Sequence, residues 1–204
     1  KRLIDLRHNG MIKVITGMRR CGKSYLLFNL FTDALKAKGV DEENIVQINL
    51  EDRRNKSLRD PDKLLAYIDS RLKDNKMYYI LLDEVQLVNE FEDVLNSYLQ
   101  VKNADVYVTG SNARFLSKDV ITEFRGRGLE IRVHPLSFSE IRGARPDEPI
   151  EQLWIEYITY GGLPQVITMN SDQEKVDYLK GLFKHTYLKD IKERYDIKLD
   201  GDLE

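Results

Sequence analysis

The 204-residue sequence contains one cysteine, Cys21, which excludes an internal disulfide framework and is typical of a reducing cytosol. No apolar run approaches membrane-spanning length, and nothing resembles a signal peptide, so we expect a cytoplasmic protein that does not enter the membrane. The net charge of -2 provides no global positive field that would attract nucleic acid, although a local basic patch stays compatible with it. His8, His134 and His185 are far apart and lack metal-ligand spacing, so we interpret them as structural.

Neither end of the sequence resembles a natural terminus. The chain begins at Lys1 rather than at methionine and ends in a charged stretch, so we expect it to be a piece of a longer protein. Its 42% hydrophobic and 32% charged residues are typical of a soluble globular protein, and the sequence contains no internal repeat. This length suffices for one α/β domain with a small appendage.

A phosphate-binding motif, Walker A, is present at residues 17–24, which read GMRRCGKS and match G-x-x-x-x-G-K-[ST]. Its glycines let the backbone curl so that N–H groups point at a polyphosphate, and the helix that follows directs its positive end at the same anion. Lys23 can reach the β- and γ-phosphates, and the Ser24 hydroxyl can hold Mg²⁺. The alternative is a chance glycine-rich turn.

The flanking sequence favours the phosphate loop over that alternative. Residues 11–16 form a short β-branched run that predicts a strand. After the loop, apolar residues recur at helical spacing until about Gly39, namely Leu26, Leu27, Leu30, Phe31, Ala34 and Leu35. Strand, loop and helix therefore follow in the order that nucleotide binding requires.

We expect the whole loop to contact the nucleotide, through Gly17, Arg19, Arg20, Cys21, Gly22, Lys23, Ser24 and Tyr25. Arg19 and Arg20 either flank the nucleotide or bind a surface acid, and we favour a structural role for Arg20. Cys21 has no base beside it in the sequence, so its backbone N–H matters more than its thiol.

Strand-like runs alternate with helical patterns up to about residue 135, which predicts a parallel sheet covered by helices on both faces. The further strands are expected at residues 45–50, 78–83, 105–110 and 129–133, and helices at residues 60–72 and 91–99.

From Pro135 onward the pattern is helical only, with a capping box at 137–140, a helix that ends at Gly161-Gly162 and another helix around 176–183. We therefore predict a core at 1–134 and a helical lid, with the start of a truncated C-terminal region, at 135–204. Trp154 is expected in the core of the lid.

The apolar strand predicted at 78–83 leads into two carboxylates, Asp83 and Glu84, and delivers them to the carboxyl edge of the sheet, where the phosphate loop also lies. We expect Asp83 to hold Mg²⁺ together with Ser24, and Glu84 to orient the attacking water. An acid at this point favours water as the phosphoryl acceptor. The alternative is a solvated turn.

Two more segments contain candidate site residues. Ser111 and Asn112 follow the strand at 105–110 and either touch the γ-phosphate or cap the next helix. In the basic turn before the last strand, Arg125 or Arg127 either stabilises charge on the transferring phosphoryl group, in its own subunit or a neighbour's, or pairs with nearby acids. We favour Arg127 over Arg125.

Several blocks occur in one order along the chain: GMRRCGKS, YYILLDEVQ, VTGSNARFLS, FRGRG, VHPLSFSEI and YGGLP. Over nearly its whole length the sequence closely resembles prokaryotic AAA-like ATPases that carry a C-terminal domain of unknown function. It is also similar to the nucleotide-binding cores of STAND-type signalling ATPases, in which a G-x-P motif of the lid contacts the adenine side.

The resemblance implies an α/β P-loop NTPase fold with five mainly parallel strands in the order 5-1-4-3-2, in which an extra strand separates the phosphate-loop strand from the Asp83 strand. It implies that Gly162 and Pro164 contact the nucleotide from the lid, where the residues alone indicate a helix end and a turn. It further makes Asn112 the sensor, Arg127 the arginine of the GR turn, and ATP with Mg²⁺ the ligands.

The sequence and the resemblance thus indicate an AAA-like ATPase in which Lys23, Glu84, Asn112 and Arg127 serve catalysis. Asp83 is the acidic residue at the end of the Walker B motif, the strand at 78–83, and the lid reports the nucleotide state. Its task would be remodelling, a nucleic-acid transaction or regulation, with a protein or nucleic-acid partner and self-association through Arg127. One alternative is a nucleotide-gated switch with little turnover, and a weaker one is a small-molecule kinase, which the Asp83-Glu84 pair disfavours.

Overall fold

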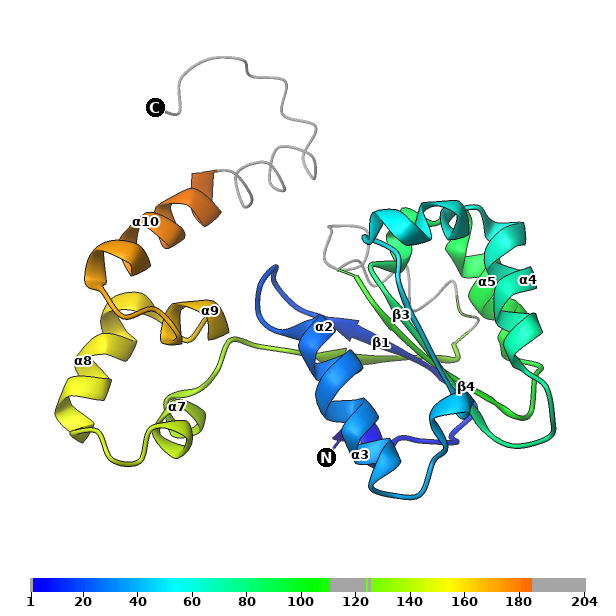
Figure 1. Ribbon diagram of the computed structural model, residues 1–204, viewed down its shortest axis with the longest axis horizontal. Coiled ribbons are helices and arrows are strands. Elements are labelled where there is room, and N and C mark those ends of the chain that lie inside the picture. Colours follow the sequence, from blue (N-terminus) through cyan, green and yellow to red (C-terminus); the bar gives the residue numbers. More distant parts are fainter. Residues whose placement is uncertain (1, 111–123, 125, 185–204) are drawn as a thin grey trace, which may run out of the picture. The chain divides into compact units, whose positions relative to one another are not determined.

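The computed structural model describes residues 2–110, 124 and 126–184. The chain consists of two compact units (Figure 1): the first comprises Lys1–Gly17 and Gly22–Val133, and the second Met18–Cys21 and His134–Glu204. In the described ranges, no helix is long and apolar enough to cross a membrane.

The first unit is built on a five-stranded sheet. The strands are β1 (Ile12–Thr16), β2 (Ile45–Asn49), β3 (Tyr78–Asp83), β4 (Ala104–Thr109) and β5 (Gly128–Arg132). Their order is β2-β3-β4-β1-β5, and each described pair of neighbours is parallel. This confirms the predicted α/β P-loop fold and its order 5-1-4-3-2, in which β4 lies between β1 and β3.

Strand residues alternate between two hydrophobic clusters, one on each face of the sheet. In β3, Ile80 and Leu82 belong to one cluster and Leu81 belongs to the other. Both clusters are buried, which is why the strand reads as a continuous apolar run rather than as an alternating one. Helices cover each side (Figure 1).

The structure contains the three predicted helical segments of this unit, after the phosphate loop and near residues 60–72 and 91–99, and it adds short helices that the sequence analysis did not predict. In chain order, the helices are α1 (Arg2–Asp5), the run α2 (Lys23–Tyr25), η1 (Leu26–Phe31) and α3 (Thr32–Lys36), then η2 (Glu42–Asn44), η3 (Arg53–Arg59), α4 (Pro61–Arg71), η4 (Val85–Leu87) and α5 (Phe91–Tyr98). The Asp60 carboxylate caps α4 by accepting from the backbone N–H of Lys63, and Pro61 occupies the first turn.

The helix after the phosphate loop differs from a regular α-helix, because its middle, Leu26–Phe31, is π-helical. The hydroxyl of Thr32 donates to the carbonyl of Leu27, and Gln47 Nε2 donates to the carbonyl of Phe28 at 3.2 Å. These side-chain donors take carbonyls that a regular helix would pair internally, and such insertions widen a turn. Leu30, expected in the apolar stripe, is 53% exposed.

The second unit contains four helices among its described residues: α7 (Phe138–Ala144), α8 (Ile150–Tyr160), α9 (Pro164–Ile167) and α10 (Asp172–Leu182). The capping box predicted at Ser137 and Glu140 is present. Trp154 was expected in the core, but it is 48% exposed and packs edge-on against Phe138, with ring centroids 5.0 Å apart. Leu153 takes the buried position on α8.

Two sequence blocks of the second unit, PLSF and GGLP, are joined through their backbones. The N–H of Leu136 donates to the carbonyl of Gly162 at 2.7 Å. A Cβ atom at Gly162 would lie 1.9 Å from the carbonyl oxygen of Leu136. Only glycine therefore allows the two segments to approach this closely.

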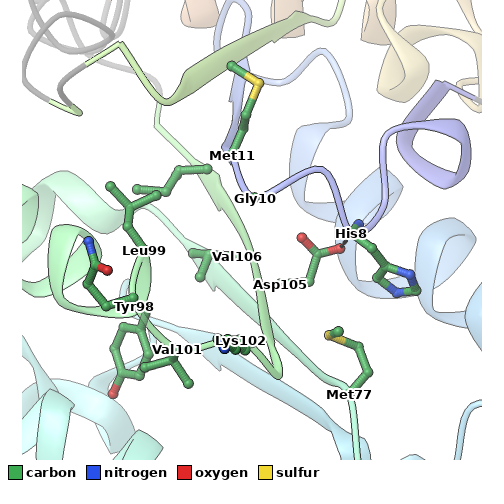
Figure 2. Close-up of a pocket in the computed structure, with 13 residues that line it drawn as sticks. His8, Gly10, Met11, Met77, Tyr98, Leu99, Val101, Lys102, Asp105 and Val106 are labelled. Atoms are coloured by element: carbon green, nitrogen blue, oxygen red, sulfur yellow. Dashed lines mark hydrogen bonds between the residues drawn. The ribbon is translucent and has the colours of Figure 1, made fainter.

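A buried ion pair joins the amino ends of β1 and β4. The ammonium of Lys13 contacts the carboxylate of Asp105, which also accepts from the N–H of His8 at 3.1 Å and from the hydroxyl of Tyr107 at 3.0 Å. Burial lowers the pKa of the Lys13 ammonium, whereas the hydrogen bond and negative charge of Asp105 raise it. A cavity of about 360 Å³ opens beside Asp105 and His8, between them and the end of α5 (Figure 2).

Asp105→Asn is expected to lower the free energy of unfolding by about 3–5 kcal/mol, because it leaves the buried ammonium of Lys13 without a counter-charge. Urea unfolding measures the change. Asp41→Asn is the matched control, since it breaks an exposed pair with Lys76 and should leave stability nearly unchanged. The double variant Lys13→Met, Asp105→Asn should regain part of the loss, and equal losses in Asp105→Asn and Asp41→Asn would refute this account.

Gly162→Ala is expected to destabilise the second unit by about 1–3 kcal/mol, because the added methyl group collides with the Leu136 backbone. Trp154 is the single tryptophan of the sequence and lies in this unit, so its fluorescence during unfolding reports the effect directly. Gly143→Ala in α7, where a Cβ meets nothing within 4 Å, should instead be neutral or slightly stabilising. Unchanged stability in Gly162→Ala would show that the second unit does not need the close backbone contact between Leu136 and Gly162.

Candidate functional site

The candidate site of the first unit lies where three neighbouring strands end. In the register of the sheet, Ile15 of β1 pairs with Thr109 of β4, and Val108 pairs with Leu82 of β3. The phosphate loop leaves β1 at Gly17, and β3 ends at Asp83. Parallel alignment therefore brings the loop and Asp83 to one sheet edge, with the end of β4 between them.

The second half of the phosphate loop turns tightly into its helix. Gly22 has φ 97° and ψ 16°, a left-handed conformation that glycine adopts without strain. The carbonyl of Gly22 accepts from the N–H of Leu26 at 2.8 Å, which begins the helical run. The side chain of Lys23 is buried, and its Nζ donates to the carbonyl of Gly17 at 3.0 Å. The ammonium is thus held by the first residue of the loop.

The Asp83 carboxylate joins the three elements at this edge. Its Oδ1 accepts from the Ser24 hydroxyl at 3.0 Å and from the Thr109 hydroxyl. Burial raises the pKa of the Asp83 carboxyl, although the hydrogen bonds from Thr109 and Ser24 partly oppose that shift. Both donors are neutral hydroxyls. They form hydrogen bonds to the carboxylate but do not neutralise its negative charge.

Glu84 stands in a conformation that is uncommon for a residue with a side chain, with φ 56° and ψ 48°. Its N–H donates to the hydroxyl of Thr109 at 3.0 Å, and its carbonyl accepts from the N–H of Leu87 at 3.1 Å. Its carboxylate accepts from Nε2 of Gln86. The backbone and the side chain of Glu84 are therefore both held, and strained conformations of this kind concentrate at functional sites.

These residues suit a nucleotide with Mg²⁺. Magnesium takes oxygen ligands and commonly uses one or two protein groups, with phosphates and water supplying the rest. Ser24 Oγ and Asp83 Oδ1, which lie 3.0 Å apart, would provide such a pair, and Lys23 would provide the ammonium for the phosphates. Among the described residues no cluster of three His, Cys, Asp or Glu could hold a metal by itself.

The structure does not bring every predicted residue to this edge. Arg127 precedes β5, and its carbonyl accepts from the N–H of Ile12 at the start of β1, so it lies at the opposite edge of the sheet from Asp83. This placement gives no support to action of Arg127 on the nucleotide site of its own subunit, and action on a neighbour's site stays a prediction. Tyr25 is 61% exposed.

The remaining predicted residues stand apart from this group. Ser111, Asn112 and Arg125 lie outside the described residues. The second unit contains Arg19, Arg20, Cys21, Gly162 and Pro164. In that unit Arg20 has a left-handed backbone, with φ 66°, and Pro164 begins α9. Nucleotide contacts by these residues stay predictions.

Sequence reasoning missed two residues of the site, Thr109 and Gln86. Thr109 was assigned only as the end of a strand, yet its hydroxyl serves both Asp83 and Glu84. Its signal was its place as the last residue of the strand that the predicted order puts beside Asp83. Gln86 follows Glu84 by two residues, and no sequence pattern marks the turn that returns its amide to the carboxylate.

Comparison with known proteins agrees with this fold. A sequence model of the AAA domain family matches residues 9–142, which is more than half of the chain. An uncharacterized protein of Haemophilus influenzae is 34% identical over 203 residues, covering 97% of this chain and 50% of that protein. The chain spans about half the length of the curated relatives it matches.

Solved structures share the fold at low sequence identity. The replication initiator DnaA bound to AMPPCP and single-stranded DNA has a TM-score of 0.55 at 13% identity, covering 98% of this chain and 69% of that one. PCH-2 of C. elegans has a TM-score of 0.53 at 14% identity, covering 95% and 63%. With the family match over residues 9–142, the chain belongs to the AAA domain family of P-loop ATPases.

Proposed function

We propose that this chain binds ATP and hydrolyses it with Mg²⁺, and that the cycle serves a remodelling, nucleic-acid or regulatory task. The observation that carries the proposal is the joint placement of Lys23, Asp83 and Glu84 around one sheet edge, with Asp83 hydrogen-bonded to Ser24. Membership of the AAA domain family supports the same reaction class.

Each residue of the site has its own role in the proposed hydrolysis. Lys23 and the loop amides would hold the phosphates, and Ser24 with Asp83 would hold the metal ion, which would supply positive charge to offset the charge that develops on the phosphates. Glu84 accepts a proton from the attacking water or orients it toward the γ-phosphate. The fixed backbone of Glu84 supports this role, because a water-orienting group must stay in position while charge develops.

Lys23→Ala is expected to weaken ATP binding about tenfold or more, because it removes a charged donor from the phosphates. Glu84→Gln should retain binding and reduce turnover by about 100-fold or more. Isothermal titration with ATP and a phosphate-release assay with Mg²⁺ measure the two effects separately.

Two matched controls accompany these variants. Lys38→Ala changes an exposed lysine near the end of the same helical run, and Glu90→Gln changes a glutamate with the same left-handed backbone on an exposed turn. Neither should alter binding or turnover. Unchanged hydrolysis in Glu84→Gln would remove Glu84 from the mechanism. Tight nucleotide binding without turnover in the wild type would instead assign a nucleotide-gated switch.

Asp83→Asn is expected to stabilise the protein in metal-free buffer at pH 7 while abolishing Mg²⁺-dependent ATP binding. Because burial raises the pKa of Asp83 in the fold, its ionised form lowers stability at neutral pH. Asparagine carries no charge and avoids this penalty. The advantage should shrink as the pH falls through the raised pKa of Asp83 in the fold, and it should be lost below about 4, where the carboxyl is protonated in both folded and unfolded chains.

Urea unfolding at several pH values tests this prediction. Asp62→Asn, at an exposed position on α4, is the control and should not raise stability. We expect Asp83→Asn to be more stable than the wild type at pH 7 without metal. Equal or lower stability would contradict the interpretation that the fold compensates the buried charge of Asp83 only weakly.

A further inference from the structure

The turn after β3 fixes Glu84 and then returns a second polar side chain to it. Val85–Leu87 form a single helical turn, and Val85 and Val88 are both buried in the core. These two apolar anchors determine the path of the turn between them. Gln86 lies within it, and its Nε2 donates to Oε2 of the Glu84 carboxylate.

The side-chain amide of Gln86 is not expected to stabilise the folded state. Its other polar atom, Oε1, is buried and has no hydrogen-bond partner among the described residues. Such an atom costs free energy that an apolar side chain of similar size would avoid. A side chain that is unfavourable for folding and contacts a functional carboxylate is expected to serve the site instead.

The contact has a direct chemical consequence for Glu84. An N–H donor on Oε2 of Glu84 restricts the orientation of its carboxylate. The backbone of Glu84 is already held by Thr109, so the donor from Gln86 restricts the freedom that is left, which is the rotation of the side chain. A group that orients water loses much of its effect when it is misplaced by about 1 Å.

We propose that Gln86 is a positioning residue for ATP hydrolysis, which aligns the Glu84 carboxylate through the hydrogen bond from Nε2. The inference rests on the proposed function, because it assigns to Gln86 an effect on the step that Glu84 performs. Gln86 acts through Glu84, so it should influence turnover and leave nucleotide binding to Lys23 and the phosphate loop.

Gln86→Leu tests the inference in the whole chain. Its kcat for ATP hydrolysis should fall about tenfold or more, while KM and the Kd for ATP stay within about twofold. Its resistance to urea should be equal to or higher than that of the wild type, because no unpaired amide oxygen remains buried. Gln100→Leu, at an exposed glutamine of the same unit, is the control and should change none of these values.

Two further measurements separate positioning from a structural effect. Gln86→Glu places a like charge beside Glu84, so the acidic limb of the kcat profile should move to higher pH. In a Glu84→Gln background, Gln86→Leu should reduce kcat no further, since the group through which it acts has been removed.

Each result has a distinct meaning. Wild-type or increased kcat in Gln86→Leu, with an active wild type, overturns the inference and leaves the proposed function intact. A loss of ATP affinity equal to the loss of kcat, or full additivity in the double variant, also overturns it. A wild type that binds ATP and never turns it over overturns the proposed hydrolysis and the role of Gln86 together.

Discussion

The carboxylate of Asp83, buried between the hydroxyls of Ser24 and Thr109, is the interaction on which the rest of the site depends. Ser24 belongs to the phosphate loop and Thr109 to the strand that separates that loop from β3. One carboxylate oxygen therefore joins the ends of β3 and β4 to the start of the helix after the phosphate loop, and the hydroxyl of Thr109 extends the connection to the backbone of Glu84. The metal-binding and water-orienting groups of the proposed site share this one network, so a change at Asp83 is expected to affect both of them.

Much of the core could be predicted from the sequence, because its signals are local. A strand buried on both faces reads as a continuous apolar run, as in residues 78–83, and Asp60-Pro61 marks the beginning of a helix through its own backbone chemistry. The phosphate loop is a contiguous motif. The order of the strands, by contrast, came from resemblance to a family, since no local pattern states which strand lies beside which.

The features that escaped prediction depend on contacts between distant residues. The π-helical turn at Leu26–Phe31 involves a donor from Gln47, which no helical periodicity contains. Trp154 resembles a core residue by its type, yet Leu153 occupies the buried position. Arg127 lies in a basic turn that the sequence already places before the last strand, and only the sheet shows that the start of this strand lies at the end of the sheet away from Asp83. The role of Thr109 likewise requires the register of two strands.

Two buried aspartates, Asp105 and Asp83, lie at opposite ends of the parallel strands. Their surroundings explain why we propose a ligand site at Asp83 and a structural role for Asp105. Asp105 contacts the ammonium of Lys13 directly, so the fold itself neutralises its charge. Asp83 receives neutral hydroxyls, and the attraction of Lys23 is the weakest of the influences on its raised pKa. A charge that the fold compensates only weakly makes the folded state less stable, and a cation bound there would offset that penalty and stabilise the fold through linkage. The same residue type, equally buried, therefore stabilises the framework at one end of the sheet and supports the proposed metal site at the other.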